Sequence, residues 1–141
     1  MFFMVKREIS KKIVAKVTIP LGHPNPPESH EVDAAFILAR HFNCEVIFII
    51  PKVDYKRKTP DIIMNGVEWE MKSPIGASRA TIENQFRRAS QQSKNIIIDT
   101  RRSSLAFEVY IKSVAFEMKK RRYIKNVLLI DKYGEVVVFE K

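Results

Sequence analysis

Three carboxylates and a lysine surround an Asn-Gly pair in the segment TPDIIMNGVEWEMKS, residues 59–73. Asn-Gly between two apolar runs predicts a two-residue β-hairpin loop, because both residues tolerate a positive φ. With that pair as the loop, Asp61 lies directly opposite Glu70, and opposed residues share one face of a hairpin with Cβ atoms about 5 Å apart. Side chains alternate along a strand, so Glu68 and Lys72 are expected on the same face.

Two carboxylates that face each other repel, and a divalent cation between them would remove that repulsion. Carboxylate oxygens and water are the ligands that Mg²⁺ prefers, and Mg²⁺ often binds substrate phosphates at the same time. Lys72 is then placed to hold an attacking water or to stabilise charge on a phosphate. The segment therefore predicts a site in which Asp61 and Glu70 bind Mg²⁺ or Mn²⁺. The alternative is a solvated sheet face on which Lys72 pairs with a glutamate.

Hydrophobic periodicity predicts the elements that position this hairpin. A helix is expected from Ser29, which can cap it, to about Asn43, and the β-branched run 44–50 is predicted as a buried strand. After the hairpin, segment 79–93 carries an apolar stripe at helical spacing, and the run 95–99 is predicted as a second buried strand. A strand, a helix and a strand in that order imply a crossover connection and a partly parallel sheet.

The rest of the chain completes a single α/β domain. A longer amphipathic helix is predicted over 104–122, and a closing hairpin over 126–140 has its turn at 132–134. We divide the domain into N-terminal strands and a loop (1–26), a core (27–102), and a C-terminal helix and hairpin (103–141).

Composition favours a polyanionic partner. The 141 residues include 25 Lys and Arg against 16 Asp and Glu, a net charge of +9.

No apolar run approaches the roughly 20 residues of a membrane span, and the first residues become charged too early for a signal peptide, so we expect a cytoplasmic protein without a membrane partner. Cys44 is the only cysteine, which excludes an internal disulfide and a thiolate metal cluster. His23, His30 and His41 lack the spacing of a metal site.

The motif PD at 60–61 followed by EMK at 70–72 resembles the signature of the PD-(D/E)XK nuclease superfamily. The elements predicted over 29–99 have the core order αβββαβ of that superfamily, whose members are similar to restriction endonucleases and resolvases. The resemblance implies a restriction-endonuclease-like mixed sheet flanked by helices, and hydrolysis of phosphodiester bonds.

The resemblance also implies roles for individual residues. Asp61 and Glu70 would be ligands of Mg²⁺ or Mn²⁺, and Lys72 would be the catalytic lysine. The superfamily often adds an acidic ligand from its first helix, and Glu31 matches that position, with Glu28 as the substitute. A glutamate in a first helical turn is also favoured by the helix dipole alone, so this alternative stays open for Glu31.

A narrower resemblance covers residues 29–102. The stretches TPD...GVEWEMKSP and ATIENQFRRASQQSKNIIIDTRR look like the C-terminal nuclease domain of contact-dependent growth inhibition toxins and related mobile-element proteins. This implies RNA, often tRNA, as the substrate, and an immunity protein as a partner if the chain acts as a toxin. The sequence begins with Met1 and shows no delivery region, so a free-standing relative with a different role is a second interpretation.

Basic and amide side chains around the predicted site are candidates for nucleic-acid contacts. Some fall on one strip of the helix beside its apolar stripe, and Arg79 is expected in the loop that precedes this helix. Others follow the strand 95–99, where sheet ends gather functional loops, or form a basic run before the hairpin. The alternative for each is an ordinary solvated face or turn. The candidates are Lys56, Arg57, Lys58, Arg79, Gln85, Arg88, Gln92, Arg101 and Arg102.

The leading prediction is a metal-dependent endonuclease with RNA or tRNA favoured. The motif itself does not distinguish DNA from RNA, so a DNA endonuclease or resolvase of a mobile element is an alternative. A non-catalytic module would keep the basic surface and bind nucleic acid without cutting it. A structural domain, dimerising through its C-terminal hairpin, would bind neither Mn²⁺ nor nucleic acid.

Overall fold

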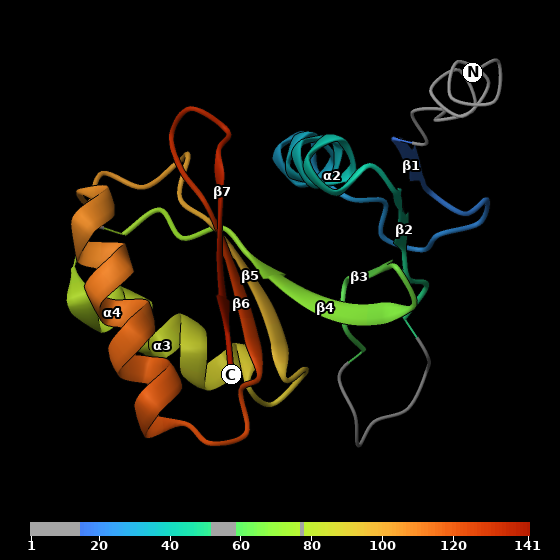
Figure 1. Ribbon diagram of the computed structural model, residues 1–141. Helices are drawn as coiled ribbons and strands as arrows, with labels where there is room; N and C mark the ends of the chain where they lie inside the picture. Colours follow the sequence, from blue (N-terminus) through green and yellow to red (C-terminus); the bar gives the residue numbers. More distant parts are fainter. Residues whose placement is uncertain (1–14, 52–58, 77) are drawn as a thin grey trace, which may run out of the picture.

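The computed structural model describes residues 15–51, 59–76 and 78–141 (Figure 1). Within these ranges seven strands form one mixed sheet, and three helices pack on it. The strands are β1 (Lys16–Thr18), β2 (Glu45–Phe48), β3 (Ile62–Met64), β4 (Val67–Lys72), β5 (Asn95–Asp99), β6 (Asn126–Ile130) and β7 (Val136–Glu140). The helices are α2 (Ser29–Phe42), α3 (Arg79–Ala89) and α4 (Phe107–Lys120).

The strands follow one another across the sheet in chain order, from β1 to β7. β2, β3 and β4 are antiparallel neighbours, whereas β4, β5 and β6 are parallel. Helix α3 makes the connection from β4 to β5, and α4 makes the connection from β5 to β6. The predicted α/β class, the core order αβββαβ and the predicted crossover are therefore confirmed.

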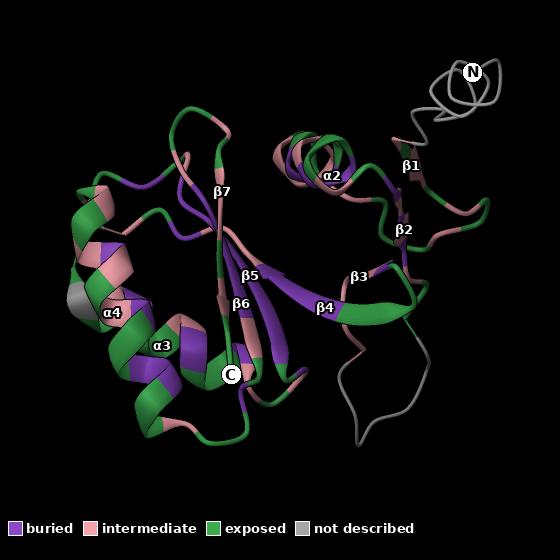
Figure 2. Ribbon diagram, in the orientation of Figure 1, coloured by how far each residue is buried: buried purple, intermediate pink, exposed green. Residues whose placement is uncertain are grey.

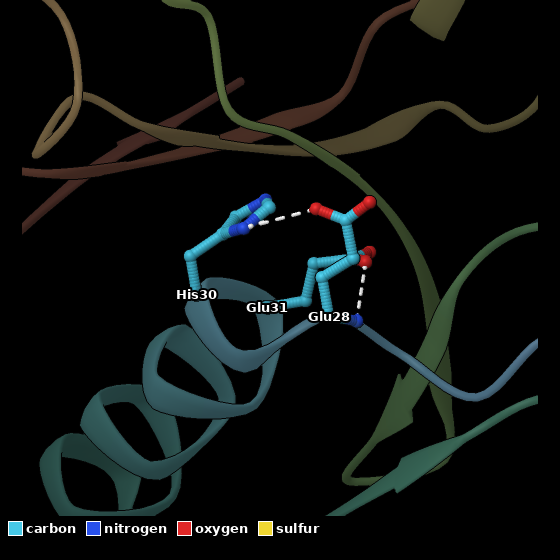
Figure 3. Close-up of side chains that lie close together, drawn as sticks. All are labelled: Glu28, His30 and Glu31. Carbon is cyan, nitrogen blue, oxygen red and sulfur yellow. Dashed lines mark hydrogen bonds and ion pairs between the residues drawn. The ribbon is translucent and has the colours of Figure 1, made fainter.

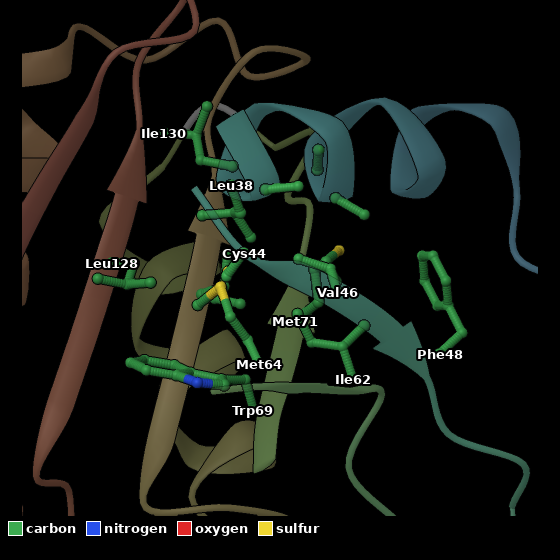
Figure 4. Close-up of a cluster of buried hydrophobic side chains, with 14 residues drawn as sticks. Leu38, Cys44, Val46, Phe48, Ile62, Met64, Trp69, Met71, Leu128 and Ile130 are labelled. Carbon is green, nitrogen blue, oxygen red and sulfur yellow. The ribbon is translucent and has the colours of Figure 1, made fainter. Parts of the chain in front are cut away.

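The two faces of the sheet carry separate hydrophobic cores. Helix α2 covers one face, where Leu38 packs above Val46, Ile62 and Leu128 (Figure 4). Helices α3 and α4 lie side by side on the other face, with their buried residues toward the sheet (Figures 1 and 2). The residues of the apolar stripe predicted over 79–93 are all buried, as expected. They are Ile82, Phe86 and Ala89 on α3, and Ser93 after the end of that helix.

The hairpin of β3 and β4 has the predicted register. Ile62 pairs with Trp69 and Ile63 pairs with Glu68. The loop residues Asn65 and Gly66 have φ values of 51° and 75°, the left-handed conformation that this turn requires.

Two helix boundaries differ from the prediction. Glu28, rather than Ser29, precedes the helical conformation of α2, and its backbone N–H donates to Glu31 Oε1 at 3.0 Å. This reciprocal contact is the capping-box arrangement, with a carboxylate where a hydroxyl is more common. Helix α3 ends at Ala89, so Gln92 lies in the following turn rather than on the helix.

Among the described residues, none of the helices has both the length and the hydrophobicity of a membrane-spanning segment. Cys44 is a free thiol within the core beneath α2, and burial raises its pKa (Figure 4).

Candidate metal and nucleic-acid site

Asp61 and Glu70 lie against each other at the start of the hairpin, as the register predicts. Asp61 N–H donates to the Trp69 carbonyl at 3.0 Å, which continues the β3/β4 ladder by one residue. The Met71 backbone N–H donates to Asp61 Oδ2 at 2.7 Å and fixes the orientation of that carboxylate. The side chain of Glu70 is near enough for Asp61 to act on its protonation.

Glu70 is the most unusual group of this site because its carboxylate is buried. Its exposed fraction is 1 %, and neither of its oxygens accepts a hydrogen bond from a donor within the described residues. Burial, and then the adjacent Asp61 carboxylate, raise the pKa of Glu70 to about 9, and the ammonium of Lys72 offsets only part of this rise. An uncompensated buried carboxylate is costly, and a second carboxylate beside it adds to that cost.

Lys72 points to the same side of the hairpin as Glu70. Its Nζ lies 3.5 Å from Glu70 Oε2 and donates to Gln92 Oε1 at 3.4 Å. The Lys72 side chain is 21 % exposed, so it joins the buried carboxylate to the surface. Gln92 thus meets the site through Lys72 although it lies beyond the end of α3.

The first turn of α2 brings further acidic side chains to Asp61. Glu28, Glu31 and Asp61 line one cleft of about 500 Å³ between that turn and the segment before β3. Figure 3 shows Glu28 and Glu31 beside His30, whose Nδ1 lies 3.3 Å from Glu28 Oε2. The possible ligand atoms of these three residues lie within 4.8 Å of one another. Helix capping explains the Glu28–Glu31 contact by itself, so this cluster identifies no metal site without Asp61.

The group formed by Asp61 and Glu70 has the donor chemistry of a divalent-cation site. A bound Mg²⁺ or Mn²⁺ would contact the buried oxygens of Glu70, which accept no hydrogen bond from the described residues and have the Lys72 ammonium at 3.5 Å as their ion-pair partner. It would also replace the repulsion between the two carboxylates by attraction. Glu31 lines the same cleft as Asp61 and is the acidic side chain of α2 that matches the predicted third ligand.

Arg101 has a structural role that the sequence prediction missed. Its Nε and Nη2 donate to the two carboxylate oxygens of Asp99 at 2.9 and 2.8 Å, and Asp99 is fully buried. Its Nη2 also donates to the His30 carbonyl at 2.9 Å, which ties the first turn of α2 to the end of β5. The predicted contact of Arg101 with phosphate stays a prediction, although its guanidinium is already bound to the Asp99 carboxylate.

The other predicted nucleic-acid contacts are spread around the site. Arg102 is exposed and donates to Ser73 Oγ at 3.2 Å, directly after β4. Arg88 is exposed and Gln85 is half-buried on α3. Arg79 begins α3 instead of lying in the preceding loop, and its side chain is not described. Lys56, Arg57 and Lys58 lie outside the described residues. The contact roles of all these residues stay predictions.

The comparisons with known proteins agree with this architecture. The family model of the contact-dependent growth inhibition CdiA C-terminal domain matches residues 58–136, more than half of the chain. A similar solved structure belongs to a CdiA-CT/CdiI toxin and immunity complex from Burkholderia pseudomallei. Its TM-score is 0.61 at 18 % identity, over 88 % of this chain and 99 % of that chain, so the likeness shows a shared fold. No curated protein matches the chain. From the family match, the chain belongs to the CdiA C-terminal toxin domains of contact-dependent growth inhibition.

Proposed function

We propose that this domain is a metal-dependent endonuclease of the PD-(D/E)XK type that hydrolyses phosphodiester bonds of RNA. The observation that carries the proposal is the buried Glu70 carboxylate, held beside Asp61 and 3.5 Å from Lys72 Nζ. A protein that needed only a stable sheet would place an apolar side chain at this position, because a buried carboxylate beside a second, half-buried carboxylate reduces the stability of the fold.

The proposed mechanism gives each residue a separate task. Asp61 and Glu70 would hold Mg²⁺ or Mn²⁺, with Glu31 of α2, which lines the same cleft as Asp61, as a third acidic ligand. When bound, such an ion polarises the phosphate and makes a neighbouring water more acidic. Glu70 must release its proton before it can bind the cation, and the Met71 N–H keeps Asp61 oriented. Lys72 stabilises the charge that develops on the phosphate, and Gln92 holds the ammonium in place.

RNA is favoured as the substrate and an immunity protein as a partner. The net charge of +9 suits a polyanionic substrate such as RNA. The chain belongs to a family of toxin domains, and hydrolysis of RNA is a toxic activity. The similar structure from Burkholderia pseudomallei is a complex of toxin and immunity protein. We extend that type of partner to this chain, whose inhibitor would cover the site or the surface that binds RNA.

An incubation panel tests the proposed activity. The protein is mixed with tRNA, linear duplex DNA and branched DNA, each with Mn²⁺, with Mg²⁺ and with chelator. We expect cleavage of tRNA only with the metal ions, loss of cleavage in Asp61→Asn, and normal cleavage in Glu68→Gln, a control on the same face of the hairpin. If only DNA is cleaved, the substrate is DNA and the assignment of RNA is wrong. If the protein binds a nucleic acid but cleaves none of them, the endonuclease assignment is wrong.

A further inference from the structure

A basic pocket lies between the last turns of α2 and the turn that joins β6 to β7. Its volume is about 550 Å³, and its polar lining comes from Arg40, His41, Arg101, Lys132 and Tyr133. Residues from three separate parts of the chain thus place cationic groups around one concave surface. Among the residues that line it there is no carboxylate.

Two cations of the basic pocket are available to a ligand. Arg40 and Lys132 are exposed, and neither forms an ion pair with a carboxylate in the part of the chain that the structure describes. Asp131, the acid next to Lys132, accepts the backbone N–H groups of Tyr133 and Glu135 at 2.8 Å each. This acid is therefore used to shape the turn.

The acids that act on Arg101 come from two elements. Asp99 pairs with it from the end of β5, and Asp33 acts on it from α2. The charge of Arg101 is therefore largely balanced, and the net positive charge of the basic pocket comes from Arg40 and Lys132.

Tyr133 adds a second kind of contact. Its side chain is 92 % exposed at the tip of the β6–β7 turn, so its ring is accessible to a ligand. The turn lies close to α2. A Cβ atom added to Gly134 would be in van der Waals contact with Ile37 Cδ1, at 3.6 Å. An exposed aromatic ring beside cations is the combination that binds single-stranded nucleic acid, where bases stack and phosphates pair with positive charge.

The basic pocket is connected to the candidate catalytic site through Arg101. This arginine lines the pocket and donates to the carbonyl of His30, the neighbour of Glu31 in the first turn of α2. We propose that the basic pocket binds a phosphate and the adjacent unpaired base of the RNA substrate, at a position away from the bond that is cut. This inference rests on the proposed function and extends it to a second contact surface.

The test uses tRNA binding in chelator, measured by fluorescence anisotropy over a range of salt concentrations. The double variant Arg40→Gln/Lys132→Gln should weaken binding about tenfold near 0.15 M salt and lower the log–log salt slope by about 1.4, since each phosphate contact on a single strand contributes about 0.7. The control Lys119→Gln/Arg122→Gln removes the same charge at the C-terminal end of α4 and should change affinity by less than about twofold.

A second variant tests stacking independently of charge. Tyr133→Ser should weaken binding roughly fivefold or more with an unchanged salt slope, whereas Tyr133→Phe should bind like the wild type. Because the substituted side chains of both tests are exposed, the variants should melt at the wild-type temperature.

The outcomes separate this inference from the proposed function. If the wild type cleaves tRNA but the double variant keeps its affinity and slope, or weakens only as much as the α4 control, the inference alone is wrong. If these variants lose affinity for an acidic protein partner but not for tRNA, the basic pocket belongs to that partner and the inference is again wrong. If the wild type neither binds nor cleaves RNA, both proposals fall together.

Discussion

Lys72 Nζ lies 3.5 Å from Glu70 Oε2, yet this nearby cation does not keep the carboxyl group at its ordinary acidity. Burial and the adjacent Asp61 outweigh the lysine and raise the pKa of Glu70 to about 9. The three groups together form a site that favours a proton between the two carboxylates, and in the proposed function a divalent cation takes the place of that proton.

The first prediction concerns the pH dependence of folding stability in chelator. Between about pH 5 and pH 9 the folded protein keeps a proton on Glu70 that the unfolded chain has lost, because the folded pKa is the higher one. The unfolded state then binds fewer protons, so the free energy of unfolding falls as pH rises, by up to about 1.4 kcal/mol per pH unit. Urea denaturation at a series of pH values measures this slope.

Two variants isolate the contribution of Glu70 from that of other groups. Glu70→Gln should remove this part of the slope and raise the stability at pH 7 by about 1–3 kcal/mol. Glu68→Gln removes an exposed carboxylate from the same strand and should keep the wild-type slope. Equal slopes in the wild type and in Glu70→Gln would show that Glu70 titrates normally.

The second prediction separates the lysine from the metal ligands. Lys72→Met should slow single-turnover cleavage by roughly 10² to 10³, the usual loss when one group that stabilises transition-state charge is removed. The same variant should still gain thermal stability from Mn²⁺, because Asp61 and Glu70 remain. A variant that cleaves at the wild-type rate would remove Lys72 from the mechanism.

The third prediction concerns the ion pair between Asp99 and Arg101. Asp99→Asn or Arg101→Gln should each lower the free energy of unfolding by about 3–5 kcal/mol, because each change leaves a largely buried charge without its partner. Arg102→Gln changes the next residue, which is exposed, and should cost less than about 0.5 kcal/mol. Denaturant unfolding of the three variants measures the difference, and equal effects would show that the pair has no special role in stability.

The parts of the fold that sequence predicts well are those with a short-range physical cause. Asn65 and Gly66 fix the register of the hairpin through their backbone conformation, and this register places Asp61 beside Glu70. The apolar stripe of α3 was predictable for a similar reason, since helical spacing alone determines which residues face the sheet. The pairing of Asp61 with Glu70 therefore needed no tertiary information.

The parts that sequence did not predict depend on contacts between distant segments. The ion pair between Asp99 and Arg101 joins residues that are two positions apart, so it is local in sequence. The hydrogen bond from Arg101 to the His30 carbonyl joins residues 71 positions apart, and no sequence pattern predicts it. The burial of Glu70 was also missed, because an alternating charged strand usually has one solvated face. The basic pocket was missed because it depends on contacts between distant segments. Arg40 and Lys132 line one pocket only because the β6–β7 turn packs on α2.

Thermal melting with and without Mn²⁺ tests the central claim most directly, namely that Asp61 and Glu70 hold a divalent ion. A ligand that binds only the folded state adds about 2.7 kcal/mol at a concentration one hundred times its Kd, so the wild type should melt at a higher temperature with Mn²⁺. The control Glu68→Gln should gain as much as the wild type, and Glu70→Gln should gain much less. If Mn²⁺ raises the melting temperature of Glu70→Gln and of the wild type equally, or of neither, Glu70 is not a metal ligand and the proposed mechanism is wrong.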